Sequence, residues 1–183
     1  MQATRGTSLS STDPAESQPS HTSRHRLLFV VVALAAYVVD LGTKLLAVAH
    51  LEPNAPKDVV GGILRLDLVR NPGAAFSTGT SYTLILSVIA VLAAGVVIRF
   101  GRRLGDRTWA VALGLLLAGV CGNLTDRVFR APGFLRGHVV DFLELPHWPV
   151  FNVADMLIDA AVLLIVIQTW RGIGISGVRH AKS

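Results

Sequence analysis

Four long apolar runs constrain this chain more than any other feature of its sequence. They cover residues 27–49, 82–98, 108–124 and 151–170. As a helix, the first run would extend roughly 34 Å, which is enough to cross a bilayer. Hydrophobic residues make up 51% of the chain and charged residues only 16%, a balance outside the usual range of soluble proteins. We therefore predict an all-α membrane protein with four transmembrane helices.

Basic residues gather on one side of the four predicted spans. They are Arg24, Arg26, Arg99, Arg102, Arg103, Arg107, Arg171, Arg179 and Lys182. By the positive-inside rule this side faces the cytoplasm, so both termini are predicted to be cytoplasmic. The rule also accounts for the net charge of +5, and we expect no nucleic acid partner. The connections at about residues 50–81 and 125–150 are then extracytoplasmic.

The chain divides into one membrane domain and two tails. Residues 1–23 are rich in serine and threonine and have no apolar periodicity, which predicts a disordered cytoplasmic tail. No part of this tail resembles a signal peptide, because it contains no apolar region followed by a small-residue cleavage site. Residues 24–172 form the predicted membrane domain. Residues 173–183 form a predicted cytoplasmic C-terminal tail.

The first external connection carries a strand signal. In residues 61–77, apolar residues partly alternate with Arg65, Asp67 and Arg70, which favours short strands. Asn71 then opens an Asn-Pro-Gly turn signal. We predict a small extracytoplasmic β-sheet, or cradle, between the first two spans.

Two carboxylates stand in surroundings where a charge is costly. Asp141 follows two valines and precedes Phe142, and Asp155 lies just inside the last apolar run. Burial disfavours the charged form of a carboxylate, and a second carboxylate nearby disfavours it further. Two such groups held together can act as an acid/base pair, in which one activates water and the other protonates the carbonyl. The residues alone do not say which carboxylate takes which role.

The segment around Asp155 also predicts a helix start. Asn152 and Asp155 have the spacing of a capping box, in which the side chain of each residue binds the backbone of the other. Capping and chemistry are compatible, since a capping geometry would hold Asp155 in place. Asp159 lies one helical turn further on and is a rival partner for Asp155. A pair of acids at this spacing in a span could instead form a cation or proton relay.

Two further polar pairs lie near the outer ends of the spans. Asp40 and Lys44 share a helix face in the first span, and Asn123 and Arg127 share one at the end of the third. Asp40 and Lys44 either form an ion pair in which Lys44 extends toward the membrane interface, or support a polar site. The segment with Asn123 is either a frayed helix end or a donor set. In the second case, Arg127 could clamp a carboxylate, a peptide carbonyl or a lipid phosphate.

Cysteine and histidine offer no competing chemistry. The single cysteine, Cys121, excludes an internal disulfide, and its position among small apolar residues favours a packing role. None of the histidines has the spacing of metal ligands.

These residues, in this order, resemble lipoprotein signal peptidase, also called signal peptidase II, the bacterial aspartic peptidase family A8. The resemblance covers about residues 27–171. It rests on five motifs: D-x-x-x-K from Asp40, NPGAAFS from Asn71, GNLTDR from Gly122, VVDF around Asp141, and FNVAD ending at Asp155. Each motif is weak alone, but five in this order on four spans are specific.

The resemblance implies a membrane endopeptidase of the bacterial plasma (inner) membrane. Its implied substrates are diacylglyceryl-modified prolipoproteins, from which it removes the signal peptide just before the lipidated cysteine. The implied catalytic residues are Asp141 and Asp155, acting near the extracytoplasmic face. Those implied to contact substrate are Asn71, Asn123, Arg127 and Asn152, and those implied to support the site are Asp40, Lys44 and Asp126.

The resemblance also implies that the enzyme needs no metal and no organic cofactor. We expect a monomer in contact with membrane lipids. Two positions depart from the family pattern as it applies here. Met156 follows FNVAD where family members often carry a small hydroxyl residue, and Asp159 lies outside the pattern.

Overall fold

The computed structural model describes residues 21–53, 55–73 and 80–179. Its helices are α1 (His21–His50), α2 (Thr80–Gly101), α3 (Arg107–Phe129) and α4 (Val153–Trp170). Within these described residues, four helices are long and apolar enough to cross a membrane. The prediction of four spans is confirmed. The predicted N-terminal tail lies almost entirely outside the described residues, and α1 begins at His21.

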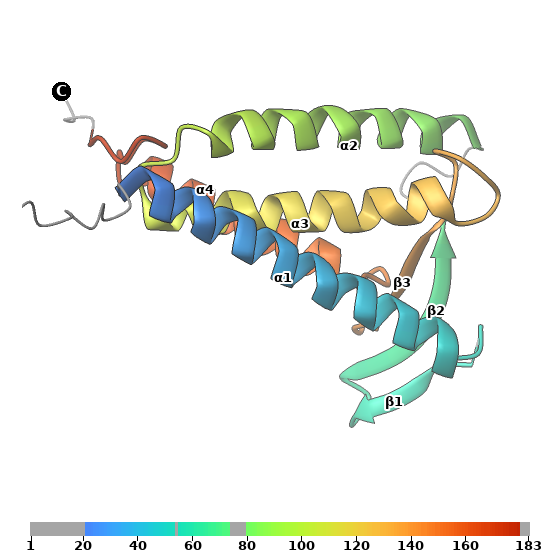
Figure 1. Ribbon diagram of the computed structural model, residues 1–183. Coiled ribbons are helices and arrows are strands. Elements are labelled where there is room, and N and C mark those ends of the chain that lie inside the picture. The colour runs from blue at the N-terminus through green and yellow to red at the C-terminus, as the bar shows by residue number, and fades with distance from the viewer. Residues whose placement is uncertain (1–20, 54, 74–79, 180–183) are drawn as a thin grey trace, which may run out of the picture.

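The helix α3 lies between the other three helices (Figure 1). It packs against α1 and α4 most extensively and against α2 along its other side. Glycines allow the close approaches, since a Cβ atom at Gly114 would lie 3.0 Å from the backbone oxygen of Phe29 in α1. Small residues serve this purpose in membrane helix packing generally. The polar site described below lies where α1, α3 and α4 meet the sheet.

The helix α3 extends five residues beyond the predicted end of the third span. It starts after Asp106, whose side chain accepts a hydrogen bond from the Trp109 backbone N–H, and continues through Phe129. The interpretation of the GNLTDR segment as a frayed helix end is therefore wrong. The polar side chains Asn123 and Asp126 find buried partners in other elements, so the helix can continue through them.

The start of α4 follows the predicted capping box. The Asn152 side chain accepts from the Asp155 backbone N–H at 3.1 Å, and the Asp155 carboxylate accepts from the Asn152 backbone N–H at 3.1 Å. This prediction is confirmed. Phe151 precedes the helix and pairs with Leu143 in an antiparallel bridge.

Three antiparallel strands form the sheet, in the order β1 (Lys57–Val60), β2 (Leu64–Asn71) and β3 (Val139–Glu144). The predicted sheet between the first two spans is confirmed by β1 and β2. The third strand comes from the connection between α3 and α4 and was not anticipated. Its first four residues are all buried, and a strand buried on both faces lacks the alternation that reveals strands in a sequence.

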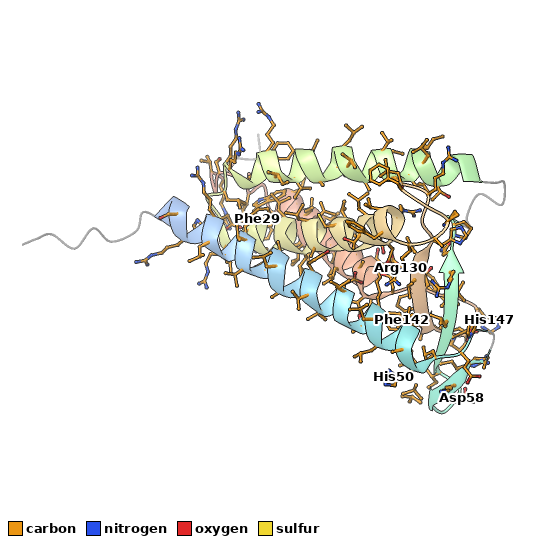
Figure 2. The ribbon with its side chains drawn as sticks, turned by 45° about the vertical axis from the view of Figure 1, so that its right-hand side comes forward. Phe29, His50, Asp58, Arg130, Phe142 and His147 are labelled. Atoms are coloured by element: carbon orange, nitrogen blue, oxygen red, sulfur yellow. The ribbon has the colours of Figure 1, made fainter. Side chains whose placement is uncertain are left out.

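An apolar cluster of packed side chains lies at each end of the molecule. At the sheet end, Ala47 of α1 packs with Leu68 of β2 and with Val140 and Phe142 of β3, which fixes the strand that carries Asp141 (Figure 2). At the opposite end, Phe29 packs with Val97, Leu104 and Trp109, among others.

The chain beyond α4 folds back onto the turn between α2 and α3. The Gly105 backbone N–H donates to the Ile175 oxygen at 2.9 Å, and the Trp109 indole N–H donates to the Ile173 oxygen at 2.8 Å. Residues 173–177 of the predicted C-terminal tail thus contact the turn before α3 and the start of that helix.

Candidate active site

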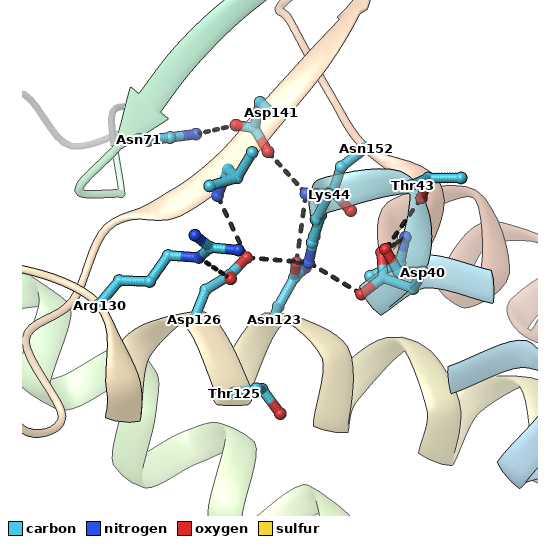
Figure 3. A network of polar contacts seen from close by, with 12 residues as sticks. Asp40, Thr43, Lys44, Asn71, Asn123, Thr125, Asp126, Arg130, Asp141 and Asn152 are labelled. Atoms are coloured by element: carbon cyan, nitrogen blue, oxygen red, sulfur yellow. Dashed lines mark hydrogen bonds and ion pairs between the residues drawn. The ribbon is translucent and has the colours of Figure 1, made fainter. Parts of the chain in front are cut away.

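Polar side chains from three helices and two strands converge at the sheet end of the helices (Figure 3). The structure brings together all of the site residues that the sequence predicted. They are Asp40 and Lys44 of α1, Asn71 of β2, Asn123, Asp126 and Arg127 of α3, Asp141 of β3, and Asn152 and Asp155 at the start of α4.

Asp141 is a buried carboxylate held by two amide donors. Its side chain lies in β3, and the residue is 2% exposed. The Asn71 amide donates to one carboxylate oxygen at 2.8 Å, and the Asn152 amide donates to the other at 2.6 Å. Burial raises the pKa of Asp141 from 3.8 to about 6; the two amide donors oppose this rise, and the nearby charge of Asp155 adds to it. Asp141 is therefore suited to exchange a proton near neutral pH.

Asp155 is held in a different electrostatic setting. One carboxylate oxygen accepts from the Asn123 amide at 2.8 Å, and the other accepts from the Asn152 backbone N–H at 3.1 Å. The residue lies in the first turn of α4, where the helix dipole favours a negative charge. The two carboxylates thus share Asn152, which binds Asp141 through its side chain and Asp155 through its backbone.

Lys44 is enclosed at the centre of the network. The residue is 0% exposed, and its ammonium group lies 3.0 Å from an Asp40 oxygen, 3.1 Å from an Asp126 oxygen and 2.9 Å from the Asn123 amide oxygen. The interpretation in which Lys44 extends toward the membrane interface is therefore wrong. The three ammonium donors have three acceptors inside the bundle, so nothing draws the side chain outward.

The two carboxylates that pair with Lys44 also bind the backbone beside the two site carboxylates. Asp126 accepts from the Val140 N–H at 3.2 Å, one residue before Asp141. Asp40 accepts from the Ala154 N–H at 2.8 Å, one residue before Asp155. Asp126 is further paired with Arg130. Asp126 and Asp40 thus fix the backbone directly before each of the two site carboxylates.

Arg127 supplies a donor that the chain itself does not use. Its guanidinium lies in the electrostatic field of Asp141, Asp126 and Asp155. Its Nη1 atom is buried and, within the described residues, has no hydrogen-bond partner. A buried donor without a partner is costly, so this atom suits an acceptor that arrives with a ligand.

Several contacts of the site could not be found by inspecting residue types. The N–H groups of Val140 and Ala154 belong to the backbone and leave no mark in the sequence. Thr83 and Ser87 of α2 donate to the backbone oxygens of Pro72 and Leu135, and so join α2 to the loops around the site. One missed contact did have a signal, because Asp126 and Arg130 have the i, i+4 spacing of a helical ion pair.

Two features considered in the sequence lie outside the network. Asp159 is exposed on α4, and within the described part of the chain its carboxylate has no hydrogen bond or ion pair. Cys121 lines an apolar cavity of about 420 Å³ between α1 and α3, together with Tyr37 and Leu117. Positions 74–77 of the NPGAAFS motif lie outside the described residues.

Comparisons with known proteins agree on one family. The family model described as signal peptidase (SPase) II matches residues 32–171. The chain is 48% identical to a lipoprotein signal peptidase of Rhodococcus jostii, over 91% of this chain and 85% of the relative. It is 48% identical to one from Streptomyces coelicolor, over 88% and 80%.

Solved structures share the fold of this chain. A structure described as a bacterial membrane enzyme superposes with a TM-score of 0.69 at 26% identity, covering 77% of this chain and 91% of the other. A second structure with the same description has the same fold, with a TM-score of 0.70 over 84% and 94% of the two chains. Together with the four spans, these matches identify a multi-pass membrane protein. The chain therefore belongs to the signal peptidase II family.

Proposed function

We propose that Asp141 and Asp155 form the acid/base pair with which this chain hydrolyses its substrate. Family membership makes the chain an aspartic peptidase that removes signal peptides from prolipoproteins. We propose in addition that these two residues carry out the catalysis. Cleavage falls just before a cysteine that carries diacylglycerol. The observation that carries the proposal is the pair of hydrogen bonds from Asn152, one to each carboxylate.

The proposed reaction is direct hydrolysis by an activated water molecule. Asp155 removes a proton from water as the water oxygen attacks the scissile carbonyl carbon, and Asp141 gives its proton to the carbonyl oxygen. The tetrahedral intermediate then collapses: Asp141 takes a proton back from one of its hydroxyl groups, the C–N bond breaks, and Asp155 gives its proton to the amino group of the lipidated cysteine as that group leaves. No covalent acyl-enzyme forms. The pair returns to its starting state with one proton shared between the two residues.

The division of roles follows from the surroundings of each carboxylate. A pKa of about 6 lets Asp141 hold a proton just below neutral pH. Asp155 lies at a helix N-terminus and accepts two N–H donors, which favours its negative charge. Two carboxylates in unlike environments commonly divide acid and base roles in this way.

Arg127 and the three asparagines are proposed to contact the peptide. The unpartnered Nη1 of Arg127 is the donor best suited to a substrate carbonyl. Asn71, Asn123 and Asn152 each hold a site carboxylate through a side-chain amide, so they would also orient the pair when substrate binds.

We further propose that the site faces the extracytoplasmic side of a bacterial plasma membrane. Both termini are then cytoplasmic, as the distribution of basic residues favours. The lipid-modified cysteine would reach the pair from within the bilayer, with its acyl chains still in the membrane. A monomer is sufficient, because every residue invoked comes from one chain.

The test is cleavage of a synthetic diacylglyceryl prolipopeptide by purified protein in detergent. Asp141→Asn and Asp155→Asn should each lower kcat by at least about a thousandfold, since each removes one proton-transfer group. Asp159→Asn is the matched control and should stay close to wild type. Insertion and thermal unfolding are measured for all three variants. Retained cleavage in either Asp141 or Asp155 variant would rule out the pair.

The same experiment addresses the rival class of a proton or cation relay. A relay that uses the acids of α4 would fail in Asp159→Asn and would depend on a gradient across the membrane. The proposed peptidase works in detergent without any gradient. A third alternative is a structural subunit, which only holds a partner protein in the membrane. In that case even the wild type would not cleave the prolipopeptide.

A further inference from the structure

The end of the molecule opposite the carboxylate pair carries an unusual surface. Eight exposed arginines lie near the starts of α1 and α3, near the ends of α2 and α4, and in the segment that follows α4. They are Arg24, Arg26, Arg99, Arg102, Arg103, Arg107, Arg171 and Arg179. Figure 2 shows nitrogen-tipped side chains standing out from this end, away from the sheet. We refer to these eight residues as the arginine face.

The arginine face has almost no compensating negative charge. Asp106 is the only acidic residue at this end within the described residues. Its carboxylate already accepts hydrogen bonds from the Trp109 backbone N–H at 3.0 Å and from the Gln168 side chain at 2.7 Å. Across the part of the chain that the structure describes, none of the eight guanidinium groups forms an ion pair. Among the described residues the face is therefore a positive surface without counter-ions from the protein itself.

Packing at this end brings arginines of different helices together. The Arg26 guanidinium donates to the backbone oxygen of Arg102 at 2.6 Å, which joins the start of α1 to the end of α2. Gly101 lies against the ring of Phe29, where a Cβ atom would approach to 2.9 Å. The arginines at the start of α1 and those that follow α2 thus lie at one place on the surface, close to each other, rather than spread around the rim.

We propose that the arginine face binds the phosphate groups of anionic phospholipids. Position supports lipid as the source of the phosphate, because the face lies at the ends of helices long and apolar enough to cross a membrane, and the ends of spanning helices meet the headgroups of a bilayer. Residue type supports phosphate as the ligand. At this end the described chain carries arginine and no lysine, and the planar guanidinium matches the oxygens of a phosphate with two parallel donors.

This role differs from the topological role of basic residues. The positive-inside rule counts lysine and arginine alike, so charge for topology does not require guanidinium groups. A phosphate site does distinguish them, since an ammonium group cannot make the paired donor contact. Substitution by lysine therefore separates the two roles.

The experiment measures lipid retention by the purified full chain with native mass spectrometry. Phosphatidylglycerol is titrated against phosphatidylcholine with the same acyl chains. The wild-type protein should retain phosphatidylglycerol in preference to phosphatidylcholine. Arg102→Gln with Arg103→Gln should weaken that retention by about fivefold for each arginine removed. Arg102→Lys with Arg103→Lys should lose part of it while leaving topology unchanged.

The matched control removes two exposed arginines from the sheet end, Arg70→Gln with Arg136→Gln, and should retain phosphatidylglycerol like the wild type. Thermal unfolding in phosphatidylcholine checks the fold of each variant. If the Arg102 and Arg103 variant does not fold, Arg171→Gln with Arg179→Gln takes its place.

Three results would overturn the proposal. Equal retention of the two lipids by wild type would remove the preference for an anion. Full retention by the lysine variant would show that positive charge alone binds the lipid, which would overturn the paired guanidinium contact with phosphate. Displacement of the bound lipid by millimolar inorganic phosphate would identify a site for free phosphate. The measurement does not use cleavage, so its outcome is independent of the roles proposed for Asp141 and Asp155.

Discussion

The Asn152 side-chain amide donates a 2.6 Å hydrogen bond to Asp141, across the junction between α4 and β3. The same residue caps α4 and binds Asp155 through its backbone. One residue therefore takes part in the helix start and in holding both carboxylates. This explains how two acids from separate elements can act as a unit.

Substitution of Asn152 should separate its capping role from its chemical role. Asn152→Ala should cost about 1 kcal/mol of stability through the lost cap and lower kcat by about 10²–10³-fold through the lost donor. Asn152→Ser can still cap the helix, so it should recover stability without recovering kcat. Thermal unfolding and single-turnover cleavage measure the two effects. A serine variant with wild-type kcat would contradict the role given to the amide.

The pH dependence of kcat/KM should report the proton on Asp141. The pKa of this group is raised to about 6 by burial, and the proposed acid must be protonated in the free enzyme. The value of kcat/KM should therefore fall as pH rises through about 6. Asn71→Ala removes a donor that favours the ionised form, so the pKa of Asp141 should rise and the falling limb should move to higher pH.

The control for the pH experiment is Arg70→Gln, the exposed neighbour of Asn71. This substitution leaves both donors to Asp141 in place, so the pH at which kcat/KM falls should not change. A rise in kcat/KM through pH 6, in place of a fall, would assign the base role to Asp141 and reverse the proposed division.

Removal of the buried Lys44 side chain should destabilise the protein more than removal of an exposed lysine side chain. Its ammonium group pairs with two buried carboxylates, those of Asp40 and Asp126. Lys44→Met would leave both without their shared cation, at a cost of about 3–5 kcal/mol. Lys57→Met, at an exposed lysine, should change stability by less than about 0.5 kcal/mol. Equal unfolding temperatures for the two variants in detergent would show that the buried network carries no stability.

Two glycines in spanning helices should respond oppositely to alanine. A Cβ atom at Gly122 would collide with the Asp40 carboxylate and lie 3.3 Å from the Ala154 Cβ. Gly122→Ala should therefore cost about 1–3 kcal/mol and lower activity, because it displaces the start of α4. Gly95 in α2 has nothing within 4 Å of the added atom, so Gly95→Ala should be neutral or stabilise the helix by up to about 1 kcal/mol. Destabilisation of similar size at both sites would argue against close packing at Gly122.

The features that the sequence predicted depend on local physics. A run of about 20 apolar residues must be placed in a bilayer wherever it occurs, so the four spans could be read directly. The capping box of Asn152 and Asp155 is also local, since its bonds join residues three positions apart. The second strand lies within the segment that showed partial alternation. The choice of Asp141 and Asp155 came from motif order, and their catalytic roles remain a prediction.

Only the tertiary structure decided how these pieces act on each other. The bond from Ala154 to Asp40 joins residues 114 positions apart, and the bond from Asn71 to Asp141 joins residues 70 apart. The third strand and the burial of Lys44 likewise depend on which distant segments lie together. Local patterns fix where a helix or span begins, because their energy comes from neighbours in the chain or from the bilayer. The partner of a buried charge is fixed only when the helices pack, because distant segments supply it.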